Sequence, residues 1–209
     1  MVSLALRYPW RRVCWPATAV IWLLACAAGL AWLARYQNIP GPVAPSPAQW
    51  PQDSKIERAA EGTTLVMFVH PHCPCTRASL DELERIVAQS GGRLSPRVVF
   101  FRPRSADAQW QQTDLWRTAA ALPGVQVTTD LDGAEAARFA AATSGHTVLF
   151  DHQGKLLFSG GITLARGHSG DNPGHTAVVA LARENAAACS QTPVFGCPLS
   201  PATQPLEIR

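Results

Sequence analysis

The sequence predicts an α/β domain with a mixed β-sheet and helices on both of its faces. An apolar run over residues 64–69 has the length of a buried strand, and an amphipathic helix follows it directly. Segments typical of strands and of helices then alternate. Residues 147–150 and 155–158 read as two strands that the turn 151–154 joins into a hairpin. Strands that alternate with helices and end in a hairpin and a last helix indicate a mixed sheet flanked by helices.

The N-terminal region predicts a membrane anchor. Residues 13–34 carry no charge and are long enough to cross a bilayer core, which takes about 20 residues. Arg7, Arg11 and Arg12 precede this run, and only Arg35 follows it closely. This asymmetry predicts residues 1–12 in the cytoplasm and the rest of the chain outside. A cleaved signal peptide is the alternative, but the apolar run is longer than a typical signal core.

The remaining chain divides into a linker, a domain and a tail. Residues 35–54 contain five prolines, which disfavour helix and sheet and favour an extended spacer. The folded domain is expected over residues 55–188, and a cysteine-containing tail over residues 189–209.

Within the domain, the first helix places its apolar and charged residues on opposite faces. Leu80, Leu83 and Ile86 share one face, whereas Glu82 and Arg85 fall on the other. The elements expected after it are a strand at 97–101, a helix at 106–122, a strand at 125–127, a short helix at 134–142, the hairpin, and a helix at 176–188 that ends at Cys189.

Two cysteines lie where the first strand meets its helix. The unpaired N–H groups and the dipole of a helix N-terminus favour a thiolate, and Arg77 adds a positive charge nearby. We expect Cys73, as the more exposed of the two, to attack a partner disulfide and Cys75 to resolve the mixed disulfide. This chemistry needs no cofactor.

The same segment allows a metal site. His70, His72, Cys73 and Cys75 lie within six residues, and thiolate with imidazole suits Cu(I) or Zn(II). His146, at the start of a later strand, could approach the same end of the sheet. Copper is therefore the alternative cofactor, and a redox-inert adaptor is a third possibility.

Four cysteines follow the anchor, and four cysteines allow three pairings. One pairs Cys73 with Cys75 and Cys189 with Cys197, so that the second bond staples the tail. Another brings Cys197 to the thiol pair as a resolving thiol. We favour the staple and keep the second arrangement as an alternative.

The junction of strand, thiols and helix, together with residues 145–155, resembles the thioredoxin-like superfamily, and more narrowly its membrane-anchored periplasmic members. The resemblance implies thiol–disulfide exchange with extracytoplasmic or membrane proteins, a single-pass inner-membrane anchor and a periplasmic domain. A subset of these proteins delivers copper to respiratory oxidases.

Two positions depart from the pattern of that family. Cys73-Pro74-Cys75 has one residue between its cysteines instead of two, which puts His72 at the family's first cysteine position. Gly145, just before His146, occupies the position of the family's cis-proline. These residues are expected to shape the site.

Charge and motifs exclude other classes of function. The formal net charge is +3 and the basic residues are scattered, so no nucleic-acid partner is indicated. The sequence contains no nucleotide-binding or Ser-His-Asp pattern.

Overall fold

The computed structural model describes residues 10–184 and 186–199 of the 209-residue chain. The predictions for residues 1–9 and for the tail beyond residue 199 lie outside these ranges, and so do the side chains of residues 10–14. The chain divides into two units, Met1–Asn38 and Ile39–Arg209.

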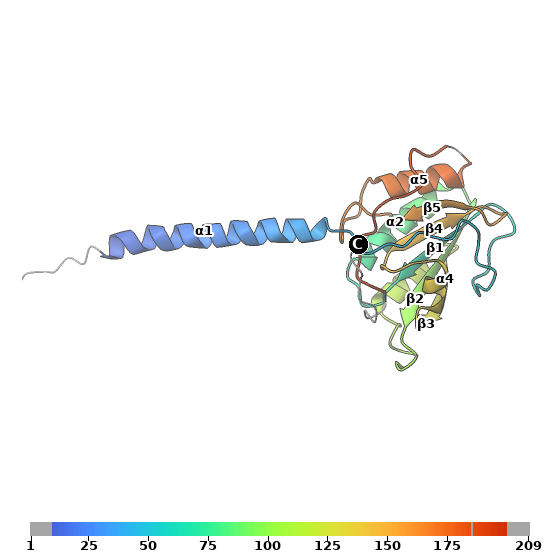
Figure 1. Ribbon diagram of the computed structural model, residues 1–209, viewed down its shortest axis with the longest axis horizontal. Helices are drawn as coiled ribbons and strands as arrows, with labels where there is room; N and C mark the ends of the chain where they lie inside the picture. The colour runs from blue at the N-terminus through green and yellow to red at the C-terminus, as the bar shows by residue number, and fades with distance from the viewer. Residues whose placement is uncertain (1–9, 185, 200–209) are drawn as a thin grey trace, which may run out of the picture. The chain divides into compact units, whose positions relative to one another are not determined.

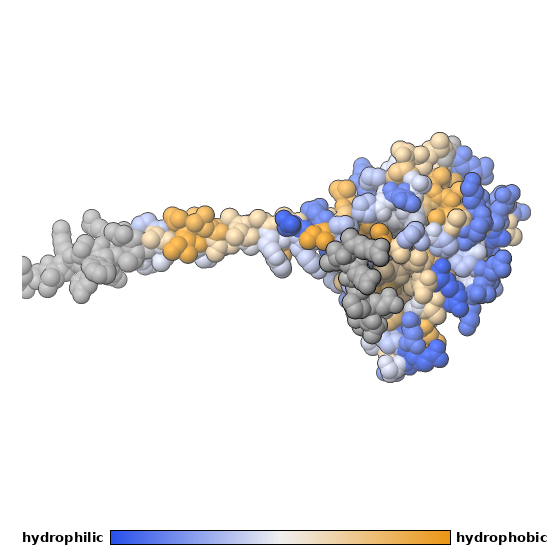
Figure 2. Space-filling view, viewed as in Figure 1, coloured by the Kyte–Doolittle hydropathy of each residue, from blue (hydrophilic) through white to orange (hydrophobic). Residues whose placement is uncertain are grey.

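The first unit holds helix α1, Trp10–Gln37. Its segment Trp15–Gln37 has a mean hydropathy of 2.0 and is long and apolar enough to cross a membrane. Figure 2 shows apolar side chains along much of this helix, and Trp15, Trp22 and Trp32 are exposed. The helix includes Arg35–Gln37, so the first residues of the predicted linker are helical.

The second unit is built on a five-stranded sheet with the order β3-β2-β1-β4-β5 (Figure 1). Strand β1 is parallel to β2, and β2 is parallel to β3, whereas β4 is antiparallel to β1 and to β5. The strands are β1 Thr63–Val69, β2 Leu94–Arg102, β3 Gln126–Leu131, β4 His146–Phe150 and β5 Leu156–Gly160. The predicted mixed sheet is confirmed, with the strand that precedes the thiols at its centre.

Helices cover both faces of the sheet, as predicted. Leu65 and Met67 of β1 point to the face covered by α2 (Thr76–Gln89), α3 (Asp114–Ala121) and α5 (Pro173–Ala182). Val66 and Phe68 alternate with them and point to the face covered by α4 (Ala134–Arg138). All four side chains are at most 1% exposed. Because the central strand is buried on both faces, the turn at its end is held in a fixed position.

Three predicted helices are shorter than expected. The helix expected over residues 134–142 ends at Arg138. Residues 106–113 form turns instead of helix, because the Asp107 carboxylate accepts hydrogen bonds from the backbone N–H groups of Gln109 and Trp110, each at 2.9 Å. The last helix begins earlier, after Asn172, whose side chain accepts the His175 N–H at 2.8 Å. It ends at Ala182, so Cys189 lies beyond the helix and not at its end.

The proline-rich segment packs on the domain and is not a free spacer. The Trp50 N–H donates to the Gly154 carbonyl at 2.7 Å, and the Leu156 N–H donates to Ala48 at 2.9 Å. The Trp50 ring contacts the rings of Phe139 and Phe150 edge-on. The compact unit therefore begins at Ile39, earlier than the predicted boundary.

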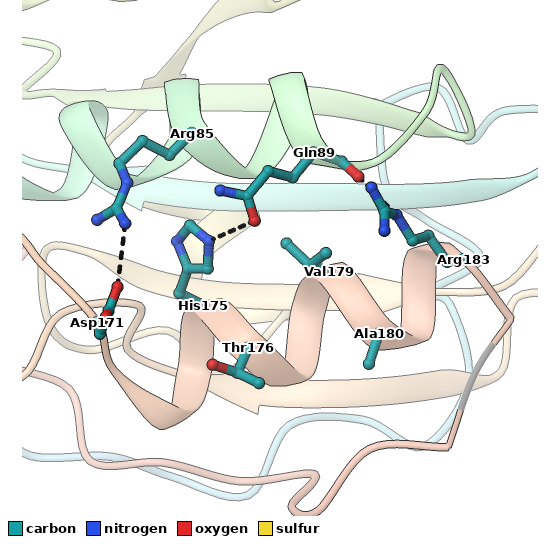
Figure 3. A pocket seen from close by; sticks show the side chains of 8 residues that line it. All are labelled: Arg85, Gln89, Asp171, His175, Thr176, Val179, Ala180 and Arg183. Carbon is teal, nitrogen blue, oxygen red and sulfur yellow. Dashed lines mark hydrogen bonds and ion pairs between the residues drawn. The ribbon is translucent and has the colours of Figure 1, made fainter.

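A buried polar group joins α2 to α5. Glu82, expected on the exposed face of its helix, is fully buried, and its carboxylate lies 2.7 Å from His175 Nδ1 and 2.9 Å from Arg85. In the shallow pocket between the two helices, His175 also contacts Gln89 at 3.2 Å, and Arg85 pairs with Asp171 at 3.1 Å (Figure 3). Glu82 is buried because these groups satisfy its oxygens, which periodicity alone does not reveal.

Candidate active site at the start of α2

Cys73 and Cys75 lie in a tight turn between β1 and α2. The Cys73 N–H donates to the His70 carbonyl, and the Thr76 N–H donates to the Cys73 carbonyl, each at 3.1 Å. Cys75 is the N-cap residue of α2. The prediction that the thiols lie beside a helix N-terminus is therefore confirmed.

A third sulfur completes the site. The Sγ atoms of Cys73 and Cys197 lie 3.1 Å apart, and the Cys75 thiol also forms a hydrogen bond with the Cys73 sulfur. Cys73 is only 1% exposed, whereas Cys75 and Cys197 are half-buried. The expectation that Cys73 is the more exposed cysteine is wrong, because Cys197 lies against it.

Cys189 lies apart from this group. Its sulfur contacts the Pro173 carbonyl at 3.9 Å, at the start of α5. The structure therefore brings Cys197 to the thiol pair and does not bring Cys189 to Cys197, which is the arrangement that we did not favour from the sequence.

The three thiols differ in acidity. The pKa of Cys73 is lowered to about 4, mainly by the hydrogen bond from the Cys75 thiol, although burial acts in the opposite direction. The Cys197 thiol and the backbone N–H groups of Cys197 and Cys75 lower it further. The same hydrogen bond raises the pKa of Cys75. Burial, followed by the interaction with Cys73, raises the pKa of Cys197 to about 11. The lowered pKa favours the thiolate form of Cys73, and the raised pKa values favour the protonated forms of Cys75 and Cys197.

The cation that acts on the thiols is not the predicted one. Arg77 forms an exposed ion pair with Asp114, and this pair lowers the pKa of the Asp114 carboxyl. Arg166, in the loop after β5, donates to the Gly196 carbonyl, and its charge opposes the raised pKa values of Cys75 and Cys197. No motif marks Arg166 in the sequence, because it lies far along the chain in a glycine-rich loop.

The histidines of the motif pack against aromatic rings. The His70 ring stacks on the Phe101 ring, and their centroids lie 5.8 Å apart. The His72 and Trp110 rings form a T-shaped contact with centroids 4.5 Å apart. Burial, followed by the charge of His72, lowers the pKa of His70. His70 and His72 thus hold Trp110 over the turn.

The metal-ligand set that the sequence suggests is not gathered at one point. His146 is buried, which lowers its pKa to about 4, and its Nε2 lies 2.9 Å from the Ser159 hydroxyl instead of a thiol. Across residues 10–184 and 186–199, no group of three or more His, Cys, Asp or Glu side chains is arranged to hold a metal ion.

The start of β4 closes the site on its other side. Gly145 has φ +89°, and its N–H donates to the Phe68 carbonyl at 2.8 Å. A Cβ added there would lie 3.0 Å from the Ser79 hydroxyl. Ser144, which the sequence analysis missed, accepts the His70 N–H at 2.9 Å and lies 3.0 Å from the Thr76 hydroxyl. It fixes β4 to both ends of the thiol turn.

A surface pocket of about 310 Å³ opens beside Cys73, between the thiol turn and the start of α3. Its lining residues are Pro71, His72, Cys73, Pro74, Arg77, Thr113, Asp114 and Leu115. Pro74 and His72, both expected to shape the site, thus form the exposed rim next to the buried sulfur.

Together, the strand order and the thiols at the end of the central strand define a thioredoxin-like fold. No family model matches the sequence, and no curated protein matches it. The chain is similar in structure to a hypothetical protein from Sinorhizobium meliloti 1021, with a TM-score of 0.58 and 18% identity over 79% of this chain and 96% of that one. It is also similar to an uncharacterized conserved protein from Geobacillus kaustophilus, with a TM-score of 0.57 and 19% identity over 80% and 95% of the two chains.

A pneumococcal exposed lipoprotein thioredoxin from Streptococcus pneumoniae matches less closely, with a TM-score of 0.44 and 16% identity over 60% of this chain and 86% of that one. At these identities the similarities concern the fold alone.

Proposed function

We propose that this protein is a membrane-tethered thiol–disulfide oxidoreductase that acts on disulfides or thiols of other extracytoplasmic or membrane proteins. The observation that carries the proposal is the geometry of the thiols: the Cys73 sulfur lies 3.1 Å from the Cys197 sulfur, two residues before Cys75 at the start of α2. The lowered pKa of Cys73 agrees with this arrangement. A thiolate is the attacking species in disulfide exchange, and a neighbouring thiol is needed to release the product.

The reaction proceeds in two exchange steps. The Cys73 thiolate attacks one sulfur of the partner disulfide and forms a mixed disulfide, and the other partner sulfur leaves as a thiolate that takes up a proton. A second thiol of the site, Cys75 in the hypothesis from sequence, then loses its proton and attacks the Cys73 sulfur. The partner leaves with two thiols, and the protein holds one disulfide. The reverse sequence oxidises a partner dithiol.

Formation of the mixed disulfide changes the pKa of the thiols that remain. The raised pKa of Cys75 comes mainly from its hydrogen bond to Cys73, and the negative charge there adds to it. Once Cys73 is part of a mixed disulfide, this charge no longer exists. The pKa of the remaining thiols therefore falls at the stage at which one of them must become a nucleophile.

The N-terminal helix supports the proposed location. Helix α1 contains a segment that is long and apolar enough to span a bilayer, and three arginines precede the apolar run. We infer a single-pass anchor in the inner membrane with the N-terminus inside and the folded domain in the periplasm. An oxidising compartment is also the one in which such thiols find disulfide-bearing partners.

Trapping of the mixed disulfide tests the proposed function. The full-length protein in detergent micelles, with Cys75→Ser and Cys197→Ser combined, is treated with glutathione disulfide and examined by intact mass and peptide mapping. We expect one glutathione on Cys73 in this variant and much less in the wild type, because the wild type can resolve the adduct. Cys73→Ser is the control. A double variant that never takes up glutathione on Cys73 would refute the proposal.

Copper binding is the second candidate, because the Cys73 and Cys197 sulfur atoms lie 3.1 Å apart and thiolate sulfur suits Cu(I). Equilibrium binding of Cu(I) to the reduced full-length protein distinguishes the two functions. A copper chaperone requires tight stoichiometric binding that is weakened when His72 is replaced, whereas a thiol exchanger does not.

A further inference from the structure

Residues 197–199 of the C-terminal tail lie beside the active site as a short added strand. The Ser144 N–H donates to the Cys197 carbonyl at 2.8 Å, and the Leu199 N–H donates to the Ala142 carbonyl at 2.9 Å. Thr143 and Pro198 form the antiparallel bridge between these two hydrogen bonds. This is the backbone pairing by which an extended peptide adds to a free strand edge, and here it presents a cysteine to Cys73.

Close packing holds this segment in place. Gly196 lies so near the Ser144 carbonyl oxygen that an added Cβ would collide with it, and Arg166 donates to the Gly196 carbonyl. Leu199 is 3% exposed and packs in the apolar cluster on the α4 face of the sheet. Upstream, the Val194 carbonyl accepts the Gly41 N–H at 2.8 Å. The tail is therefore a part of the fold that runs directly to the thiols.

The position of the tail restricts the access of another protein to the Cys73 sulfur. Cys73 is 1% exposed, and Cys197 is the tail residue in contact with its sulfur. A sulfur atom of another protein cannot approach Cys73 along the same path while Cys197 occupies it. A partner segment that pairs with residues 142–144 therefore has to displace the tail from this strand edge.

We propose that residues 196–199 occupy, within the chain, the surface on which an extended cysteine-bearing segment of a partner polypeptide binds, and that Cys197 forms a reversible disulfide with Cys73. This inference rests on the proposed function and assigns the resolving role to Cys197 instead of Cys75. Cys75 then acts as a positioning residue whose thiol donates a hydrogen bond to the Cys73 sulfur.

The redox step balances with the partner disulfide as the oxidant. After Cys73 has formed a mixed disulfide, the tail returns to the strand edge, and the Cys197 sulfur gives up its proton and attacks the Cys73 sulfur. The bond between Cys73 and the partner breaks, the partner sulfur leaves as a thiolate and is protonated, and the Cys73–Cys197 bond forms. The new disulfide fixes the tail over the site until a dithiol reduces it.

Disulfide mapping of the full-length protein tests this assignment. Trypsin places Cys73 and Cys75 in the peptide 59–77, and Cys189 and Cys197 in the peptide 184–209. After oxidation with glutathione disulfide and alkylation, we expect these two peptides to be linked in the wild type and in Cys75→Ser and Cys189→Ser. The link should disappear in Cys197→Ser and in Cys73→Ser.

The alternative outcomes have distinct meanings. A bond within the peptide 59–77, with Cys197 alkylated, would overturn the inference and keep the proposed function. A bond within the peptide 184–209 would show a stapled tail and would also overturn it. Failure of Cys73 to take up glutathione in the double variant described above would instead refute the proposed function itself.

A second measurement examines the occupied surface. Gly196→Val introduces a side chain that collides with the Ser144 carbonyl and should displace the tail. In the reduced full-length protein, we expect iodoacetamide to modify Cys73 roughly tenfold faster. A tenfold change corresponds to the loss of about one hydrogen bond between the tail and residues 142–144. Cys189 in the same molecule is the internal control. An unchanged rate at Cys73 would show that the tail does not cover it.

Discussion

The hydrogen bond from Cys75 to Cys73 leads to a quantitative prediction for Cys75→Ala. The Cys75 thiol is the largest single cause of the lowered pKa of Cys73, which is about 4 in the wild type. A hydrogen bond to a charged group contributes about 1.5–3 kcal/mol, and one pKa unit corresponds to about 1.4 kcal/mol. Removal of this donor should therefore raise the pKa of Cys73 by about one to two. The Cys197 thiol and the backbone donors should still hold it below that of a free thiol.

Thiolate absorbance near 240 nm measures this change. The full-length protein is titrated, and the curve of Cys73→Ser is subtracted to isolate the signal of Cys73. In the wild type the thiolate should persist through neutral pH and disappear only as the pH falls through about 4, because protonation removes the charge. The midpoint should be higher in Cys75→Ala and unchanged in Cys189→Ala. An unchanged midpoint in Cys75→Ala would refute the role assigned to Cys75.

Three further predictions concern the surroundings of the thiols. Gly145→Ala should lower the free energy of unfolding by about 1–3 kcal/mol in urea titrations, because φ is +89° and the new Cβ meets Ser79; equal stability would contradict the strained conformation. Phe139→Ala should cost about 3–5 kcal/mol in the same assay, since this ring is fully buried between the sheet and Trp50, and a loss below 1 kcal/mol would argue against that packing. Arg166→Gln should raise the pKa of Cys197 further and slow the resolution of the glutathione adduct, whereas Arg77→Gln should not; equal rates in the two variants would remove Arg166 from the site.

Local sequence patterns predicted the central part of the fold. The apolar run before the thiols became β1, and the periodicity after them became α2, which begins at Thr76 beside Cys75. The hairpin was also predictable, because the Asp151 side chain accepts the Gln153 and Lys155 N–H groups in the turn. In each case the determining contacts lie within a few residues along the chain.

The features that were missed depend on contacts between distant segments. Cys197 reaches Cys73 through pairing of the tail with residues 142–144, and no local pattern in the tail encodes this register. Glu82 has the spacing of an exposed residue but is buried because His175 and Arg85 bind its carboxylate. The first half of the helix predicted over residues 106–122 forms turns instead, because the Asp107 side chain accepts a backbone N–H there. Periodicity reports the average environment of a helix face, and it does not register one specific polar partner.

Equilibration of the full-length protein with glutathione buffers of graded redox ratio tests the central claim most directly. The measured quantity is the fraction of Cys73 present in a disulfide, read by alkylation and peptide mapping. If the Cys73 thiolate exchanges disulfides, this fraction should rise as the buffer becomes more oxidising and return along the same curve when the ratio is reversed. A Cys73 that stays alkylatable at every ratio, or that oxidises and cannot be reduced again, would contradict the account.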